Sequence, residues 1–141
     1  MKSICHRLLI KASPETVYNA LTLEEGLSAW WTPETKAKPA TGSIARFAFG
    51  PDYFKEMKIT NLEPFSKVEW LCVKGYEEWI GTTLTFELQA VEKGTVLFLH
   101  HDGWKAYTKE FAGCSYDWAL FLRSLRLLCE TGKGVPYPDQ G

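Results

Sequence analysis

The stretch that decides the fold runs from Asp117 to Pro138, DWALFLRSLRLLCETGKGVPYP. It combines the end of a long amphipathic helix, a glycine stop and a short tail that contains prolines. Apolar residues recur here at steps of three and four positions, which places them on one stripe of a helix: Trp118, Phe121, Leu122, Leu125, Leu128 and Cys129. Phe111 and Cys114 extend the same stripe toward the N-terminus.

Capping residues mark both ends of this helix. Thr108 is a candidate N-cap, and Gly132 occupies the place where a left-handed C-cap is needed. A helix over residues 108–131 would be roughly 35 Å long at 1.5 Å per residue, which is about twice the usual length. An equally long surface must cover its apolar stripe, and the rest of the chain supplies mostly strands. The sequence therefore predicts a single long helix lying across a sheet.

Alternation and turn signals divide the preceding residues into short elements. Ser13 caps a helix that Pro14 and Glu15 open, and a second short helix over 24–31 ends before Pro33. The expected strands cover residues 4–10, 43–50, 53–62, 67–73, 82–91 and 95–102, with a weaker one at 34–38. The order is one strand, two short helices, a strand meander and the long helix, which is an α+β arrangement.

Composition places the chain among ordinary globular proteins. Its 141 residues carry 16 Lys plus Arg and 17 Asp plus Glu, so no large field favours nucleic acid or an acidic membrane. No apolar run is long enough to span a bilayer, and the N-terminal one is too short for a signal peptide. We therefore expect one domain over residues 1–141, cytoplasmic, with no nucleic-acid partner and no membrane insertion.

Four segments resemble the domain of heat-shock-chaperone ATPase activator homologues: ASPETVYNALT (12–22), AWWTP (29–33), HHDGW (100–104) and LLCETGKGVPYP (127–138). That group belongs to the START-like, or SRPBCC, superfamily, which includes lipid-transfer domains, polyketide cyclases and pollen allergens. The resemblance implies a helix-grip fold, in which a curved antiparallel sheet of six or seven strands wraps around the C-terminal helix, often with an apolar cavity between them. It does not imply a reaction.

The side chains that would face such a cavity are large and mostly aromatic. Strand parity, the helix stripe and the tryptophans of the short helices give the predicted ligand-binding set: Trp30, Trp31, Phe47, Phe49, Trp70, Trp79, Phe86, Leu99, His101, Trp118, Phe121, Leu122 and Leu125. A curved sheet and a straight helix leave a gap, expected beneath residues 118–125, unless these side chains close it. Both an open and a filled cavity are consistent with the sequence.

A ligand held there would be mainly apolar, with a few polar anchors. The candidate anchors are His101, Tyr53, Trp79, Tyr116 and Glu56. His101 has the inward strand parity of Leu97 and Leu99, and two roles are open to it: it closes the core by hydrogen bonding, or it acts as a general acid or base.

Other signatures of catalysis are missing from the sequence. It contains no GxSxG elbow, P-loop, HExxH or GxGxxG motif. Cys5, Cys72, Cys114 and Cys129 lack metal-ligand spacing, so we expect reduced thiols, no metal site and no cofactor. Glu77-Glu78 is interpreted as solvated, as is the group of bases formed by Lys36, Lys38, Arg46, Lys55 and Lys58.

Two functions from different classes follow. The first is a domain that binds or carries an apolar, lipid-like small molecule under the long helix. The second is an interaction module that acts on a heat-shock chaperone through its outer surface; a cyclase or hydrolase using the same pocket is a third reading. Val96 and Phe98 have outward parity on their strand, which predicts a homodimer formed through the sheet.

Overall fold

The computed structural model describes residues 2–141. In this part of the chain one antiparallel sheet has the strand order β1-β7-β6-β5-β4-β3-β2. The strands are β1 (Lys2–Ile10), β2 (Glu34–Lys36), β3 (Ile44–Ala48), β4 (Phe54–Glu63), β5 (Lys67–Lys74), β6 (Thr83–Val91) and β7 (Gly94–Trp104), and the helices are α1 (Pro14–Thr22), α2 (Glu24–Trp30) and α3 (Lys109–Thr131). The α+β helix-grip arrangement is confirmed, with seven strands and three helices in the described residues.

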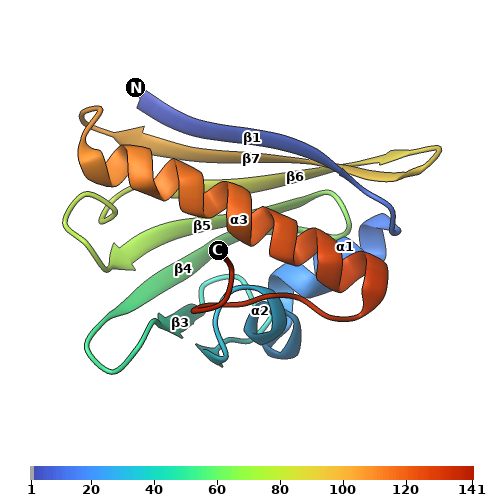
Figure 1. Ribbon diagram of the computed structural model, residues 1–141, viewed down its shortest axis with the longest axis horizontal. Coiled ribbons are helices and arrows are strands. Elements are labelled where there is room, and N and C mark those ends of the chain that lie inside the picture. The colour runs from blue at the N-terminus through green and yellow to red at the C-terminus, as the bar shows by residue number, and fades with distance from the viewer. Residues whose placement is uncertain (1) are drawn as a thin grey trace.

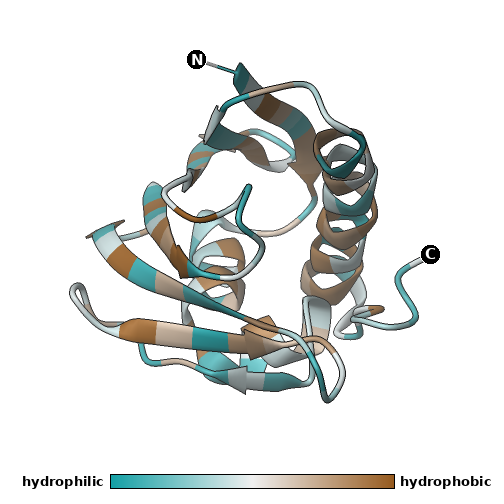
Figure 2. Ribbon diagram, turned by 90° about the vertical axis from the view of Figure 1, so that its left-hand side faces the viewer, coloured by the Kyte–Doolittle hydropathy of each residue, from teal (hydrophilic) through white to brown (hydrophobic). Residues whose placement is uncertain are grey.

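The three helices lie on one side of the sheet. Figure 1 shows α3 crossing the sheet, with α1 and α2 gathered near one end. Figure 2 shows the sheet curving past one side of α3, with hydrophobic positions on both elements. The largest of the fully buried side chains, Trp30, Trp31, Trp70 and Trp118, belong to the core between these layers. The sheet and α3 therefore enclose an aromatic core.

The expected helix ends are confirmed in detail. The Ser13 side chain accepts a hydrogen bond from the Thr16 amide at 3.1 Å, and Thr108 accepts one from the Phe111 amide at 3.1 Å. Gly132 ends α3 with a φ of 87°, a left-handed conformation that glycine adopts without a steric penalty. The two ends of α3 therefore lie where the capping residues predict.

The strand ends differ from the expected ranges by one or two residues, and two of these differences have a clear cause in the pairing. β7 continues to Trp104 because β1 keeps pairing with it as far as Lys2 opposite Trp104. The weak strand at 34–38 is reduced to Glu34–Lys36, an edge strand paired only with β3 in the described sheet.

The C-terminal tail is fixed against α2 and α3. Val135 donates its amide hydrogen to Ser124 Oγ at 2.7 Å, and the Tyr137 amide donates to the Trp31 carbonyl at 2.8 Å. Any Cβ at residue 134 would collide with the Ala29 carbonyl oxygen, so the close approach requires Gly134. This docking carries the tail back toward the middle of the molecule, where Figure 1 shows the chain ending near β4.

Candidate functional site

A cavity of about 620 Å³ lies beneath the N-terminal half of α3. Its other walls come from the start of β4, the loops before and after the β4–β5 pair, and the tail. The aromatic residues of the lining are Trp31, Phe49, Tyr53, Tyr76, Trp79, Trp118, Phe121 and Tyr137. The other residues of the lining are Lys55, Glu77, Glu78, Glu110, Gly113, Cys114, Asp117 and Gln140. The volume falls within the usual range of small-molecule sites, about 300–1,000 Å³.

Small residues on α3 leave this space open. A Cβ added at Gly113 would meet no atom within 4 Å, and the neighbouring position is the small Cys114. Farther along α3, Leu122 and Leu125 are buried, and Ser124 Oγ bonds the Trp30 carbonyl of α2 at 2.9 Å. The gap expected beneath residues 118–125 therefore overlaps the observed one, which lies beneath residues 110–121, and α2 packs against α3 beyond it.

The structure divides the predicted ligand-binding set into two groups. Five members line the cavity: Trp31, Phe49, Trp79, Trp118 and Phe121. The other eight are buried side chains outside its lining: Trp30, Phe47, Trp70, Phe86, Leu99, His101, Leu122 and Leu125. Strand parity identifies inward residues but does not distinguish those that pack against each other from those that border a void.

His101 is fully engaged in the core. Its Nδ1 accepts a hydrogen bond from the Trp118 indole at 3.1 Å, so the proton of the neutral ring is on Nε2, 2.9 Å from Thr82 Oγ1. Burial lowers the pKa of His101 to about 3, which keeps the ring uncharged at neutral pH. The geometry favours the structural role of His101 over acid–base chemistry, because one ring nitrogen is hydrogen-bonded to Trp118 and the other to Thr82.

Lys55 is a buried charged residue of the cavity that sequence reasoning missed. It was interpreted as part of a solvated basic group, but it is 8% exposed and lines the cavity. Its ammonium lies over aromatic rings, at 4.3 Å from the Trp79 centroid and 4.4 Å from the Phe49 centroid. Parity could have found it, since Lys55 alternates in register with the buried Met57 and Ile59 on β4.

Burial lowers the pKa of Lys55 to about 8, because desolvation penalises the charged form. Within residues 2–141, no hydrogen bond or ion pair joins its ammonium to another side chain. Rings of Tyr53 and Tyr76 also face it, at 4.8 and 5.7 Å. Cation–π contacts are therefore the main protein interactions of this charge.

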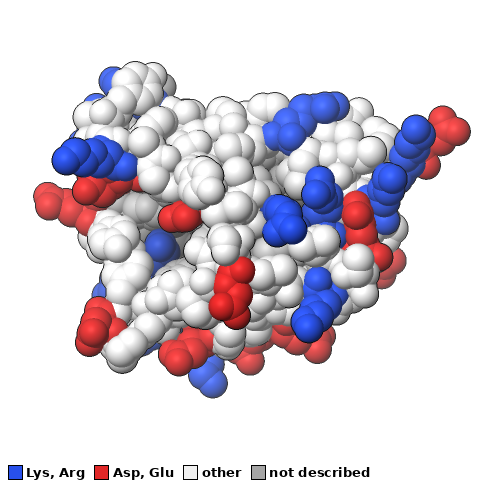
Figure 3. Space-filling model, in the orientation of Figure 1, with Lys and Arg blue, Asp and Glu red and all other residues white. Residues whose placement is uncertain are grey.

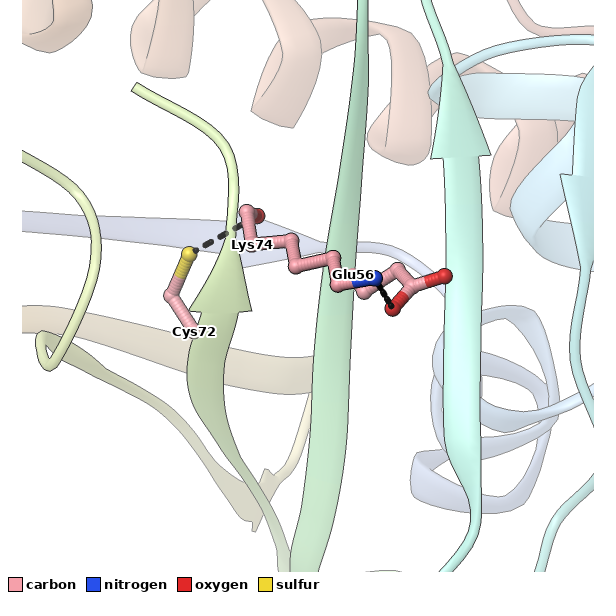
Figure 4. A network of polar contacts seen from close by, with 3 residues as sticks. All are labelled: Glu56, Cys72 and Lys74. Carbon is pink, nitrogen blue, oxygen red and sulfur yellow. Dashed lines mark hydrogen bonds and ion pairs between the residues drawn. The ribbon is translucent and has the colours of Figure 1, made fainter. Parts of the chain in front are cut away.

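Two of the candidate polar anchors, Tyr116 and Glu56, do not line the cavity, so the predictions of their position were wrong. Tyr116 is 68% exposed and outside the lining. Glu56 pairs with Lys74 at 3.7 Å, and Figure 4 shows Lys74 reaching across from β5 to meet it, while the Cys72 thiol donates to the Lys74 carbonyl. Tyr53 and Trp79 do line the cavity, as expected.

Carboxylates surround the opening of the cavity. Figure 3 shows this face of the molecule hollowed at its left, with acidic side chains near the hollow. The carboxylates of the lining are Glu77, Glu78, Glu110 and Asp117. Glu78 accepts a hydrogen bond from the Thr108 hydroxyl at 2.6 Å, and partial burial raises the pKa of Asp117. The Glu77-Glu78 pair, interpreted as merely solvated, thus borders the site.

Comparison with known proteins agrees with this architecture. A family model described as "Activator of Hsp90 ATPase homolog 1-like protein" matches residues 11–130. The chain belongs to this family. The search of curated proteins found no match.

Several solved structures share the fold of this chain. The solution structure of the Aha1 dimer from Colwellia psychrerythraea is 40% identical over 95% of this chain and 100% of that chain, with a TM-score of 0.87. A Mesorhizobium loti protein is 20% identical over 90% of this chain and 96% of that one, with a TM-score of 0.81. An AHSA1-like protein from Aeromonas hydrophila is 13% identical over 89% and 90%, with a TM-score of 0.71. The expected membership of the START-like, helix-grip superfamily is confirmed.

The remaining features of this activator homolog 1-like chain are its free thiols, its potential metal ligands and the character of its helices. All four cysteines are free, and burial raises the pKa of Cys114, which lines the cavity, to about 12. Among residues 2–141 no three His, Cys, Asp or Glu side chains converge as metal ligands would. None of the helices in that range combines the length and apolar character needed to cross a membrane.

Proposed function

We propose that this chain is a small-molecule binding domain that holds an apolar ligand beneath the N-terminal half of α3. The observation that carries the proposal is the cavity of about 620 Å³ with eight aromatic residues in its lining. A preformed apolar site with a few polar groups is the usual form of a ligand pocket. Cytoplasm remains the expected location.

The lining also suggests how a ligand would be gripped. Trp31, Trp118 and Phe121 are buried from solvent, so their ring faces offer apolar contact without further desolvation of the protein. The docked tail adds Tyr137, which packs edge-on to Phe49 with centroids 5.4 Å apart. These rings come from the residue that follows α2, from α3, from the β3–β4 loop and from the tail, so an intact fold is needed to assemble them.

Gly113→Trp should block the cavity. The added indole enters open space, and replacing a helical glycine removes a helix-propensity penalty of up to about 1 kcal/mol. We expect the dissociation constant for the neutral fluorescent probe N-phenyl-1-naphthylamine to rise on the order of 100-fold, or about 2.7 kcal/mol. The measurement is a fluorescence titration of wild-type and variant proteins.

Ala112→Trp is the matched control, because Ala112 precedes Gly113 on α3 but is exposed and outside the lining. Its probe affinity should equal that of the wild type. If the wild type and a folded Gly113→Trp variant bind the probe with equal affinity, the cavity is not the binding site.

The family description favours a second candidate, an interaction with a heat-shock chaperone. Such a module would use exposed surface, and Tyr107 and Tyr116, at 73% and 68% exposure, are available for contact. The Gly113→Trp variant separates the two functions. If the Gly113→Trp variant still stimulates a purified chaperone ATPase, the interaction module is supported. If neither the wild type nor the variant stimulates the ATPase at micromolar concentration, the interaction module is contradicted.

We also propose a homodimer formed through the outer face of β1, β7 and β6. Val96 and Phe98 are half-buried on this face, where Phe98 stacks on His100 with centroids 4.3 Å apart. The 40% identical Colwellia psychrerythraea structure is described as a dimer. Closed two-fold dimers are the commonest protein oligomers, which adds support.

Phe98→Glu should convert this dimer into a monomer, because it places a charge in an apolar contact. Light scattering of the wild type should give twice the 16.0 kDa chain mass, and the variant should give the single mass. Ile44→Glu, at a 49% exposed position on β3, is the control and should remain dimeric. A 16.0 kDa wild type at working concentration would refute the dimer.

A further inference from the structure

We propose that the cavity selects apolar molecules that carry a single anionic group, and that the Lys55 ammonium binds that group. The inference rests on the ligand-binding function proposed above and names the chemical class of the ligand. Its basis is a buried cation that faces an apolar cavity and lacks a counter-ion among residues 2–141.

The position of Lys55 leaves its hydrogen-bond donors free. An ammonium carries three N–H donors, whereas the ring faces of Phe49 and Trp79 offer no conventional acceptor. The residue is 8% exposed, so little bulk water compensates for the lost hydration. Buried charges in proteins are normally paired, and an unpaired one is strongly unfavourable. An anionic ligand group would supply the missing acceptor and the missing counter-charge.

The groups nearest to Lys55 do not neutralise it. Burial raises the pKa of the Cys72 thiol to about 11 and that of the Cys114 thiol to about 12, so both are uncharged near pH 7. Burial also raises the pKa of Tyr53. The Asp117 carboxylate is exposed and is not within ion-pair distance of the ammonium. The charge of Lys55 is therefore available to a ligand.

The distribution of charge around the cavity also orients the ligand. Lys55 is buried, while Glu77, Glu110 and Asp117 are exposed residues of the lining. These exposed carboxylates are screened by salt and water, whereas an ion pair in the buried region is screened much less. The anionic group would therefore point inward, with the apolar body against rings such as Phe121 and Tyr137. The acidic opening disfavours a ligand with several negative charges, which adds selectivity by repulsion.

A matched pair of probes tests this inference. 8-Anilinonaphthalene-1-sulfonate and N-phenyl-1-naphthylamine share the same ring framework, and only the former carries a sulfonate. We expect the wild type to bind the sulfonate at least about tenfold more tightly, as a charge-assisted hydrogen bond would give. Lys55→Met keeps an apolar side chain of similar length and should abolish that preference, with little change for the neutral probe.

Lys58→Met is the control, because Lys58 lies on the same strand but is exposed. This variant should retain the wild-type preference for the sulfonate. Gly113→Trp should remove the binding of both probes, which excludes attachment of the sulfonate to surface lysines. Unfolding curves by circular dichroism establish that each variant is folded.

A pH series on the unmodified protein gives a second test that needs no substitution. Raising the pH from 7 to 10 should weaken binding of the sulfonate, which stays ionised, and leave the neutral probe unchanged as Lys55 loses its proton. The titratable groups near Lys55 are Tyr53, Tyr76, Cys72, Cys114, Asp117, Glu77, Glu78 and His101. Burial holds the pKa of Cys72, Cys114 and Tyr53 above this range and that of His101 below it.

The outcomes separate the inference from the function on which it depends. Equal affinity of the wild type for the two probes, or a sulfonate preference that survives Lys55→Met, would overturn the role of Lys55 while ligand binding stands. Binding of neither probe, or binding that Gly113→Trp does not affect, would overturn the ligand-binding function itself and the inference with it.

Discussion

Replacing Trp31 with alanine should lower the free energy of unfolding by about 3–5 kcal/mol, the usual range for deleting a large aromatic side chain from a core. Trp31 is 2% exposed, and its ring centroid lies 4.4 Å from that of Phe47, 5.4 Å from that of Trp118 and 5.8 Å from that of Trp70. The substitution removes all three contacts and extends the cavity into the core. Urea denaturation followed by far-ultraviolet circular dichroism measures the change.

Tyr107→Ala provides the comparison for this experiment. Tyr107 is also aromatic but is 73% exposed, so its removal should change the free energy of unfolding by no more than about 0.5 kcal/mol. A loss below about 1 kcal/mol for Trp31→Ala would contradict the placement of Trp31 at the centre of the aromatic core.

Lys55→Met should have the opposite effect and stabilise the ligand-free protein at pH 7. Desolvation lowers the pKa of Lys55 from 10.5 to about 8. At about 1.4 kcal/mol for each tenfold change in the protonation equilibrium, this corresponds to an upper bound of roughly 3.5 kcal/mol, and the favourable cation–π contacts reduce it. We expect a gain of roughly 1–3 kcal/mol in the free energy of unfolding, since methionine fills the same space without a charge.

The gain should depend on pH in a defined direction. Below pH 8 both folded and unfolded chains carry the proton, and the full penalty is present. Between pH 8 and 10.5 the unfolded chain binds more protons than the folded one, so the stability contribution of Lys55 rises with pH. Urea titrations at pH 7 and pH 10.5 should therefore show the difference between Lys55→Met and the wild type shrinking.

Lys58→Met, at an exposed position of the same strand, should leave stability unchanged at both values of pH. A Lys55→Met variant less stable than the wild type, or a difference that is constant across this range, would contradict the burial of an unpaired ammonium. The stability gain and the loss of sulfonate binding would together describe a residue kept for function rather than for stability.

The architecture could be predicted from sequence because its determinants are local. Thr108 and Gly132 set the ends of α3, and Ser13 with Pro14 opens α1, as capping rules state. Alternation in β6 placed Leu84, Phe86 and Leu88 on the buried face. The resemblance of four segments to a known family supplied the curvature of the sheet, which residue periodicity alone does not contain.

The cavity could be predicted only in part, because it depends on elements that meet from distant parts of the chain. Its position follows from the packing of α2 against the C-terminal half of α3 and from the small residues Gly113 and Cys114. Tyr137 reaches the lining because Gly134 lets the tail approach Ala29 closely. No periodic pattern reveals such a contact between loop and tail.

Lys55 is a different case, because its signal was present in the sequence. A lysine in phase with Met57 and Ile59 on a half-buried strand is a local contradiction of the expected pattern, and such contradictions concentrate at functional sites. Grouping Lys55 with nearby bases by sequence distance concealed that phase. His101 shows the converse, since its inward parity was correct but both nitrogens are committed to Thr82 and Trp118.

A crystal structure of the protein with N-phenyl-1-naphthylamine bound tests the central claim most directly. We expect density for the probe beneath the N-terminal half of α3, in contact with Trp79, Phe121 and Tyr137 and bordered by Gly113. Mutual contact of these side chains with no space between them, and a probe absent or attached elsewhere, would contradict the account.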